Sequence, residues 1–236
     1  PPRSLAVLTR TATDLAEDLA ESMDRADLPC YMNEGRPLTR TVPGRIVTQV
    51  LDLADGPAER DAVIQLLSIA RVDWPEELSV TALDRISRLA GVVEGWDAWR
   101  TRLRNWAAEQ ENPDRRDGNG LSPETARRQA RLARAAAEFM DGFLPRVRRL
   151  AAPSCWTELS ADLSEFLHNC LPLGEEGHPP EGRREVLEAA EQLAELDVTG
   201  VPPSVGRASR LLQQSLNAQS RRAAKFQESR ITFGSI

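Results

Sequence analysis

The sequence predicts a mainly α-helical fold, in which a multi-helix insertion interrupts a small β-sheet formed by strands at the two ends of the chain. Apolar residues recur at steps of three and four through most of residues 41–225, and short β-branched or aliphatic segments lie at both ends. A chain of 236 residues with 41% hydrophobic residues can bury one large core or two smaller ones. We therefore expect residues 4–10 and 231–236 to be neighbouring strands in one sheet.

The first forty residues have the only α/β pattern in the sequence. Residues 4–10 are short and apolar, as in a buried strand, and residues 30–32 form a second candidate strand. Between them, apolar residues at helical spacing predict an amphipathic helix that starts at Thr11 or Thr13 and ends before Leu28. This segment is therefore expected to fold as strand, helix and strand.

Proline and glycine divide the next eighty residues into four predicted helices. Gly56 and Pro57 separate the first two, which we expect to pack as a hairpin. A shorter helix over residues 81–89 should stop at Gly91, and a longer one should cover residues 96–110 before a polar loop. The residues expected to face inward include Ile46, Val47, Val50, Ala54, Ala62, Val63, Leu66, Leu67, Ala70, Trp96, Trp99, Leu103 and Trp106.

The second half of the chain continues the helical pattern. Ser122 is a good helix cap with proline in the first turn, and Pro145 is expected to bend or divide the long helix that follows. The next helix is predicted to begin at Ser154 and to end before Pro172. Two more amphipathic stripes, over residues 186–196 and 205–216, complete the predicted helical body.

Charge and cysteine content limit the classes of protein to which the chain can belong. A net charge of −6 argues against a uniformly basic nucleic-acid coat, so any DNA contact must be a local patch. No apolar run approaches the roughly 18 residues that cross a bilayer, and the N-terminal residues lack the pattern of a signal peptide. Cys30, Cys155 and Cys170 have unrelated spacings that fit reduced packing residues. We expect a cytoplasmic protein without a membrane partner.

The motifs that hold nucleotides or carry out hydrolysis are absent from the sequence. It contains no phosphate-binding glycine loop, no Cys-x-x-Cys pair and no nucleophile elbow. His168, Cys170 and Cys155 are zinc-ligand types, but they lack a fourth ligand and a paired spacing, which favours helix packing. We therefore expect no catalytic residue, no metal site, no bound cofactor and no ATPase activity in this chain.

Three tryptophans share one predicted helix face. Trp96, Trp99 and Trp106 could stack on nucleic-acid bases if that face were exposed. Leu103 continues the same stripe, however, and this favours a position in the core. Paired acidic residues, such as Glu76 and the residue after it, are interpreted as solvated faces.

Arginines on the helix after Ser122 form the strongest candidate binding surface. Arg127, Arg131 and Arg134 are spaced four and three apart, on the side away from the apolar stripe. Acidic residues four positions away balance part of this charge, so a solvated face laced with ion pairs is the alternative to a phosphate-binding surface. The candidate DNA-phosphate contacts are Arg127, Arg128, Arg131, Arg134, Arg146, Arg149, Arg221 and Arg222.

The order of short motifs near the two ends of the chain points to a known family. Leu-Ala-Val-Leu-Thr-Arg at residues 5–10 precedes the predicted helix, Leu-Pro-Cys-Tyr-Met at 28–32 and Gly-Arg-Pro-Leu at 35–38 follow it, and Pro-Gly-Arg at 43–45 precedes the next helix. This order resembles UvrD-like superfamily 1 DNA helicases, in which a strand ending in a basic residue, a helix and a "GIPY-x-x-x-G" strand precede an inserted 2B subdomain. Residues 230–236 resemble the strand by which the chain returns to the second RecA-like lobe.

The resemblance implies a division of the chain and narrows the family. Residues 1–40 and 226–236 would belong to the RecA-like 2A lobe, and residues 41–225 would form the helical 2B-like insertion. Residues 84–103 are similar to AddB-type or RecC-like subunits, which are inactivated helicases paired with a PD-(D/E)XK nuclease. UvrD-like enzymes carry a glycine-isoleucine-glycine DNA contact near the position of residues 71–81. Here residues 71–77 lack glycine and are acidic, which argues against a duplex contact by that element.

By this resemblance the chain is expected to be a fragment of a bacterial DNA helicase or helicase–nuclease of DNA repair and recombination, acting as an accessory DNA-binding or regulatory subdomain. The fragment itself would not be an enzyme, and an active parent would hold ATP and Mg²⁺ elsewhere. Its expected partners are DNA, the rest of the helicase chain and a nuclease or helicase subunit. The first residue is Pro1 and the last, Ile236, lies in an apolar run, so we expect a segment of a longer protein. The alternative is a stand-alone helical protein-interaction domain without a DNA role.

Overall fold

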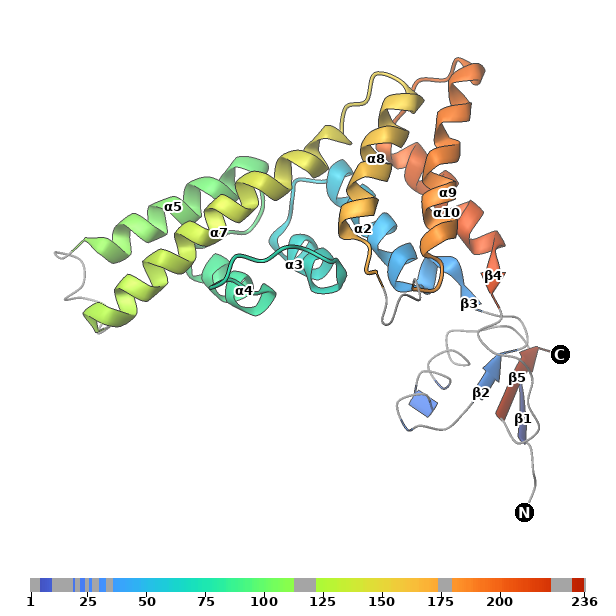
Figure 1. The fold of residues 1–236 in the computed structure, drawn as a ribbon, viewed down its shortest axis with the longest axis horizontal. Coiled ribbons are helices and arrows are strands. Elements are labelled where there is room, and N and C mark those ends of the chain that lie inside the picture. Colours follow the sequence, from blue (N-terminus) through green and yellow to red (C-terminus); the bar gives the residue numbers. More distant parts are fainter. Residues whose placement is uncertain are drawn as a thin grey trace.

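The protein is mainly helical, as the sequence predicts. The computed structural model describes residues 5–9, 19, 22–23, 26, 30–32, 36–112, 122–173, 180–221 and 231–235. Eight α-helices lie within these ranges and form an elongated body (Figure 1). They are α2 (Val42–Asp55), α3 (Arg60–Ile69), α4 (Val80–Leu89), α5 (Trp96–Glu111), α7 (Pro123–Arg149), α8 (Trp156–Cys170), α9 (Arg183–Gln192) and α10 (Val205–Ala218). Two 3-10 helices, η1 (Leu38–Arg40) and η2 (Leu193–Thr199), accompany them.

Short strands flank the helical body. β5 (Ile231–Ser235) lies between β1 (Leu5–Thr9) and β2 (Cys30–Met32) and runs parallel to both (Figure 1). In this register Ile231 is opposite Leu5 on one side and Cys30 on the other. The helix predicted after Thr11 or Thr13 falls almost entirely outside the described residues.

A second pair of strands marks the place where the chain enters and leaves the helical body. β3 (Arg36–Pro37) pairs antiparallel with β4 (Ser220–Arg221). One residue further along, the Leu38 N–H donates to the Gln219 carbonyl at 3.3 Å. The first and last residues of the helical body are therefore neighbours, although about 180 residues separate them in the sequence.

Polar side chains at helix N-termini fix where several helices begin. The hydroxyls of Thr41, Ser79, Ser122 and Ser204 each accept a hydrogen bond from the backbone N–H three residues later, at 3.2 to 3.3 Å. Such caps satisfy a donor that the helix itself leaves unpaired. The cap at Ser122 was predicted from the sequence and is confirmed.

The prediction that this helix begins at Ser154 is wrong by two residues, because α8 begins at Trp156. The Cys155 thiol occupies the cap position, and its Sγ accepts from the Glu158 N–H at 3.4 Å. The Ser154 N–H instead donates to the Glu158 carboxylate at 2.7 Å. Glu158 thus donates its N–H to the Cys155 sulfur, and its carboxylate accepts from the Ser154 N–H. The arrangement resembles a capping box in which sulfur replaces the more common hydroxyl.

The core lies between α7 and the helices packed along it. A series of aromatic contacts crosses this core: the ring centroids of Trp74 and Phe139 are 4.7 Å apart, those of Phe139 and Phe143 are 5.9 Å apart, and those of Phe143 and Phe166 are 5.9 Å apart. Trp99 of α5 is fully buried and donates its indole N–H to the Ala58 carbonyl at 3.0 Å.

The tryptophan stripe of α5 therefore belongs to the core, as the sequence favoured. Trp99 and Leu103 are fully buried, and Trp96 and Trp106 are partly buried against the same cluster. The aliphatic stripes predicted for α2 and α3 also face inward, and these two helices contact one another as expected. Trp99 itself is thus unavailable for stacking on a base.

Pro145 does not divide the long helix. α7 runs without interruption from Pro123 to Arg149. Proline cannot donate the backbone hydrogen bond that would reach the Asp141 carbonyl, which normally breaks a helix. Here Leu144 and Val147, on either side of Pro145, are both buried, so packing holds the final turns in place. Tertiary contacts outweigh the local preference.

The helix predicted over residues 186–196 changes its winding before it ends. α9 stops at Gln192, and the 3-10 turns of η2 follow, ending at Gly200 in the left-handed conformation with φ of 65°. Asp197 in η2 lies against the start of α8, where its carboxylate accepts from the N–H groups of Trp156 at 2.7 Å and Thr157 at 3.0 Å. A carboxylate from a distant segment thus serves as a second cap for α8.

We predict that Asp197→Ala destabilises the fold at neutral pH and that the loss shrinks in acid. Hydrogen bonds from the Thr157 hydroxyl and from the Trp156 N–H hold the pKa of Asp197 below its usual value. A lowered pKa in the folded state means that the charged form stabilises the fold above the unfolded pKa of about 3.9, and that this contribution is lost as the pH falls through the folded value. Thermal unfolding from pH 7 to pH 3 measures the effect.

Glu195→Ala is the matched control for this prediction, because it removes one carboxylate from the same 3-10 helix. Glu195 is exposed and makes no ion pair or side-chain hydrogen bond with the described residues. Its substitution should leave the melting temperature nearly unchanged at every pH. If Asp197→Ala lowers the melting temperature by the same amount at every pH, the charge of the carboxylate is not what stabilises α8.

We predict that Pro145→Ala stabilises the protein. Alanine restores the N–H donor to the Asp141 carbonyl and removes the clash of the ring with the preceding turn. We expect a gain of about 2 kcal/mol, somewhat below the cost of proline in a free helix because proline also restricts the unfolded chain. Urea unfolding followed by circular dichroism measures the free energy. An unchanged or lower value would mean that α7 has adapted fully to the proline.

Candidate nucleic-acid interface

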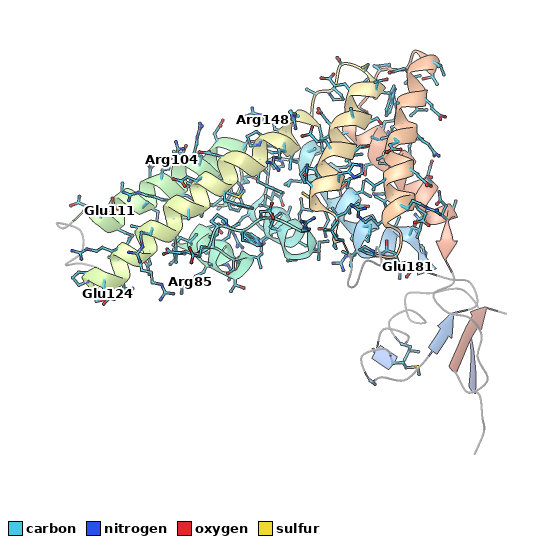
Figure 2. The ribbon with its side chains drawn as sticks, viewed as in Figure 1. Arg85, Arg104, Glu111, Glu124, Arg148 and Glu181 are labelled. Carbon is cyan, nitrogen blue, oxygen red and sulfur yellow. The ribbon has the colours of Figure 1, made fainter. Side chains whose placement is uncertain are left out.

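The arginines predicted to bind phosphate lie on the outer face of α7. The opposite face is buried, and its residues include Leu132, Ala136, Met140 and Phe143. Every arginine of this helix is exposed, because the periodicity that directs the apolar residues inward directs the arginines outward. In Figure 2 the labelled Arg148 of α7 lies along the same edge of the α5 and α7 pair as Arg104 of α5.

Three of the candidate arginines are held in ion pairs with residues outside α7. Arg134 contacts Glu111 at the end of α5, and Arg131 lies 3.8 Å from Glu77, between α3 and α4. Arg149 lies 3.7 Å from Asp162 and 3.5 Å from Glu165, both on α8. These pairs are solvent-exposed, so each stabilises the fold by only about 0–1 kcal/mol. Their charge is nevertheless largely balanced.

Four other arginines of α7 make no ion pair with the described residues. Arg127 and Arg128 lie near the start of the helix, and Arg146 and Arg148 lie near its end. Arg128 and Arg146 are 18 positions apart, a separation of about 27 Å along a helix that rises 1.5 Å per residue. Arg127 and Arg148 are 21 positions apart, or about 31 Å. The longer spacing is close to the ~34 Å length of one turn of B-form DNA, and the shorter one is about a fifth less.

The middle of α7 is neutralised by contacts with α5. Arg127, Arg134, Asp141 and Arg148 recur every seven residues and so follow one line along the helix. Asp141 in this line accepts a hydrogen bond from Arg104 at 2.5 Å and lies 3.9 Å from the Nε of Arg100. The free positive charge is consequently concentrated at the two ends of α7.

Sequence reasoning missed Arg100 and Arg104 as members of this surface, and it noted Arg148 beside Arg146 and Arg149 without including it among the candidate contacts. Arg100 and Arg104 are four positions apart on the polar side of α5, and this spacing could have identified them. Which of the arginines are paired could not have been found in this way, because every acidic partner of the α7 arginines comes from another segment.

The last two candidates cannot be placed in the interface. Arg221 is described as part of β4, opposite Arg36, but its side chain is outside the described set. Arg222 lies outside the described residues altogether.

A cavity of about 360 Å³ opens between the first turn of α5 and the last turns of α7. Apolar walls come from Trp96, Met140, Leu144 and Pro145, and Arg148 lies at the side. The residues that line it also include Asp97, Arg100, Asp141 and Arg149. The cavity thus combines an aromatic side chain with charges of both signs at one end of the arginine line.

A second cavity, of about 320 Å³, lies where the helical body begins and ends. The residues that line it all have polar side chains and are Thr39, Arg45, Thr48, Gln49, Gln213 and Asn217. Thr39 donates to the Asn217 side-chain oxygen across it at 2.6 Å. This hydrogen bond joins the two segments of the entry point beside β3 and β4.

The cysteine and histidine side chains do not form a metal site among the described residues. No group of three His, Cys, Asp or Glu side chains there is placed to hold a metal ion. Cys155 is used as a helix cap, His168 is exposed, and burial raises the pKa of the Cys170 thiol to about 11. A thiol with so high a pKa stays protonated at neutral pH, which favours the packing role. Within the described ranges, no helix has the length and apolar character needed to cross a membrane.

No protein-family model matches the sequence, and no curated protein matches it. The functional interpretation therefore depends on the sequence motifs and on the geometry of the described residues.

Proposed function

We propose that this chain is the 2B-like helical insertion of a UvrD- or AddB-type DNA helicase or helicase–nuclease, together with flanking strands of its RecA-like 2A lobe, and that it serves as an accessory DNA-binding subdomain. The proposed parent acts in DNA repair and recombination, supplies any ATP and Mg²⁺ site from other parts of its chain, and works with a nuclease or helicase subunit. The fragment itself carries out no catalysis in this proposal.

The observation that carries the proposal is the adjacency of the points where the helical body begins and ends. An inserted domain must leave and re-enter its host at neighbouring points. The bond between the Leu38 N–H and the Gln219 carbonyl, with the β3 and β4 pairing beside it, supplies such a junction. The parallel pairing of β1 with β5 is the arrangement expected of strands from one RecA-like lobe.

The DNA-binding part of the proposal depends on the four unpaired arginines of α7. A net charge of −6 repels DNA from most of the surface, so only a face with uncompensated positive charge can bind it. Arg127, Arg128, Arg146 and Arg148 form such a face at the two ends of one helix. Their separation suits two phosphate contacts about one helical turn apart on the same side of a duplex.

We predict that Arg127→Gln with Arg128→Gln weakens duplex binding far more than Arg131→Gln with Arg134→Gln. Both double variants remove the same charge from neighbouring turns of α7, but only the first removes arginines without ion-pair partners. Two lost phosphate contacts should lower the slope of log affinity against log salt by roughly 2. Fluorescence anisotropy with a labelled 20-base-pair duplex at several salt concentrations measures both quantities.

The double variant at the other end, Arg146→Gln with Arg148→Gln, should match the effect of the first. Binding should be independent of sequence, since phosphate contacts carry no sequence information. If the double variant of the ion-paired arginines, Arg131 and Arg134, loses as much duplex affinity as the variants of the unpaired arginines, net charge alone governs binding. No binding by the unaltered chain at 50 mM salt would favour the helical protein-interaction domain instead.

A further inference from the structure

The cavity between α5 and α7 has a chemistry that phosphate contacts alone do not require. An arginine row needs no aromatic wall and no carboxylate to bind a DNA backbone. Trp96 nevertheless contributes to the cavity wall, although part of its side chain is packed against the core. A volume of about 360 Å³ is at the lower end of the ~300–1,000 Å³ range of pockets that hold small molecules. It suits a single planar group and not a helix or strand.

Asp141 brings hydrogen-bond acceptors to this cavity. Its Oδ2 accepts from Arg104, but its Oδ1 is 3.9 Å from the Nε of Arg100, beyond hydrogen-bonding distance. Its backbone carbonyl points along α7 toward Pro145, which has no N–H to donate. Asp141 and Pro145 both line the cavity. A ligand at this position is therefore favoured if it presents N–H donors.

Arg148 supplies the opposite chemistry on the same side of α7. It is exposed, has no ion-pair partner among the described residues, and lines the cavity one heptad beyond Asp141. A ligand that satisfies the whole cavity must then combine a flat ring, N–H donors on that ring and an adjacent anionic group. A nucleotide with an amino-bearing base has all three properties.

We infer that this cavity binds one unstacked nucleotide of single-stranded DNA, with its base against Trp96 and Asp141 and its phosphate at Arg148. The inference rests on the proposed DNA-binding function and extends it to the single strand. The acceptors at Asp141 favour cytosine, whose N4 amino group donates, over thymine, which presents an acceptor at the equivalent position.

The test compares labelled oligo-dC and oligo-dT of twelve nucleotides at constant salt, using the full 236-residue chain. We expect oligo-dC to bind about tenfold more tightly, because a good base contact discriminates by a factor between about 5 and about 150. Asp141→Asn should abolish the preference, since its amide can donate as well as accept. Arg148→Gln should weaken the binding of both strands. Trp96→Leu should weaken both strands too, and it should remove the fluorescence change of a 2-aminopurine placed in the strand.

Controls separate this inference from the DNA-binding proposal itself. Arg127→Gln with Arg128→Gln should weaken both oligonucleotides but keep the dC preference, because these residues are distant from the cavity. Arg148 is exposed, so its variant still tests the site if Trp96→Leu fails to fold. Equal affinity for oligo-dC and oligo-dT, with duplex binding unchanged, would overturn the inference that the cavity binds a nucleotide. The proposal that the arginines of α7 bind duplex DNA would then still hold. If the unaltered chain binds no DNA but does bind an acidic peptide such as oligo-glutamate, and Arg148→Gln removes that binding, both the nucleotide site and the DNA-binding proposal are overturned.

Discussion

The apolar stripe of α7 is the constraint on which the rest of the structure depends. This helix contacts α2, α4, α5 and α8, and its inner face carries the aromatic contacts from Trp74 through Phe139 and Phe143 to Phe166. Burial of one face along 27 residues fixes the rotation of the helix about its axis, since a turned helix would expose that face to water. The same rotation decides where the arginines lie. The cationic surface is in this sense a consequence of core packing, and Pro145 is tolerated because the packing on both sides of it is extensive.

A second constraint acts where the helical body joins the flanking strands. The Leu38 N–H bonds to the Gln219 carbonyl, and the hydroxyl of Thr39 bonds to Asn217, so two consecutive residues on one side are tied to the end of α10 and the segment after it. These contacts close a loop of about 180 residues, and their entropic cost grows only slowly with the length of that loop. Closing this junction around a large helical body therefore costs little more entropy than closing it around a short segment. This property fits the proposed insertion into a host lobe.

The parts of the fold that depend on local interactions were predictable from the sequence, and the parts set by distant residues were not. The start of α7 follows from Ser122 and the proline after it, and the inward position of Trp99 follows from helical spacing. In contrast, the carboxylate of Asp197 reaches α8 from 41 positions away in the sequence to cap its first turn. The continuity of α7 through Pro145 depends on tertiary packing in the same way. For the candidate site, spacing placed the arginines on one face, but their pairing with Glu77 and Glu111 could come only from the three-dimensional arrangement.

This pairing changes what the surface can recognise in the proposed function. A helix with an uninterrupted row of free arginines would attract any polyanion, because long-range charge alone would determine binding. On α7 the ion pairs of Arg131 and Arg134, and the contacts of Asp141 with α5, balance the middle of the row and leave two cationic ends about 30 Å apart. A partner must then present negative charge at a matching interval to engage both ends. The regular spacing of phosphates on a duplex meets this requirement, whereas an acidic peptide without fixed structure would have to lose conformational entropy to meet it. Neutralising the centre of the helix thus favours a rigid partner over a flexible one.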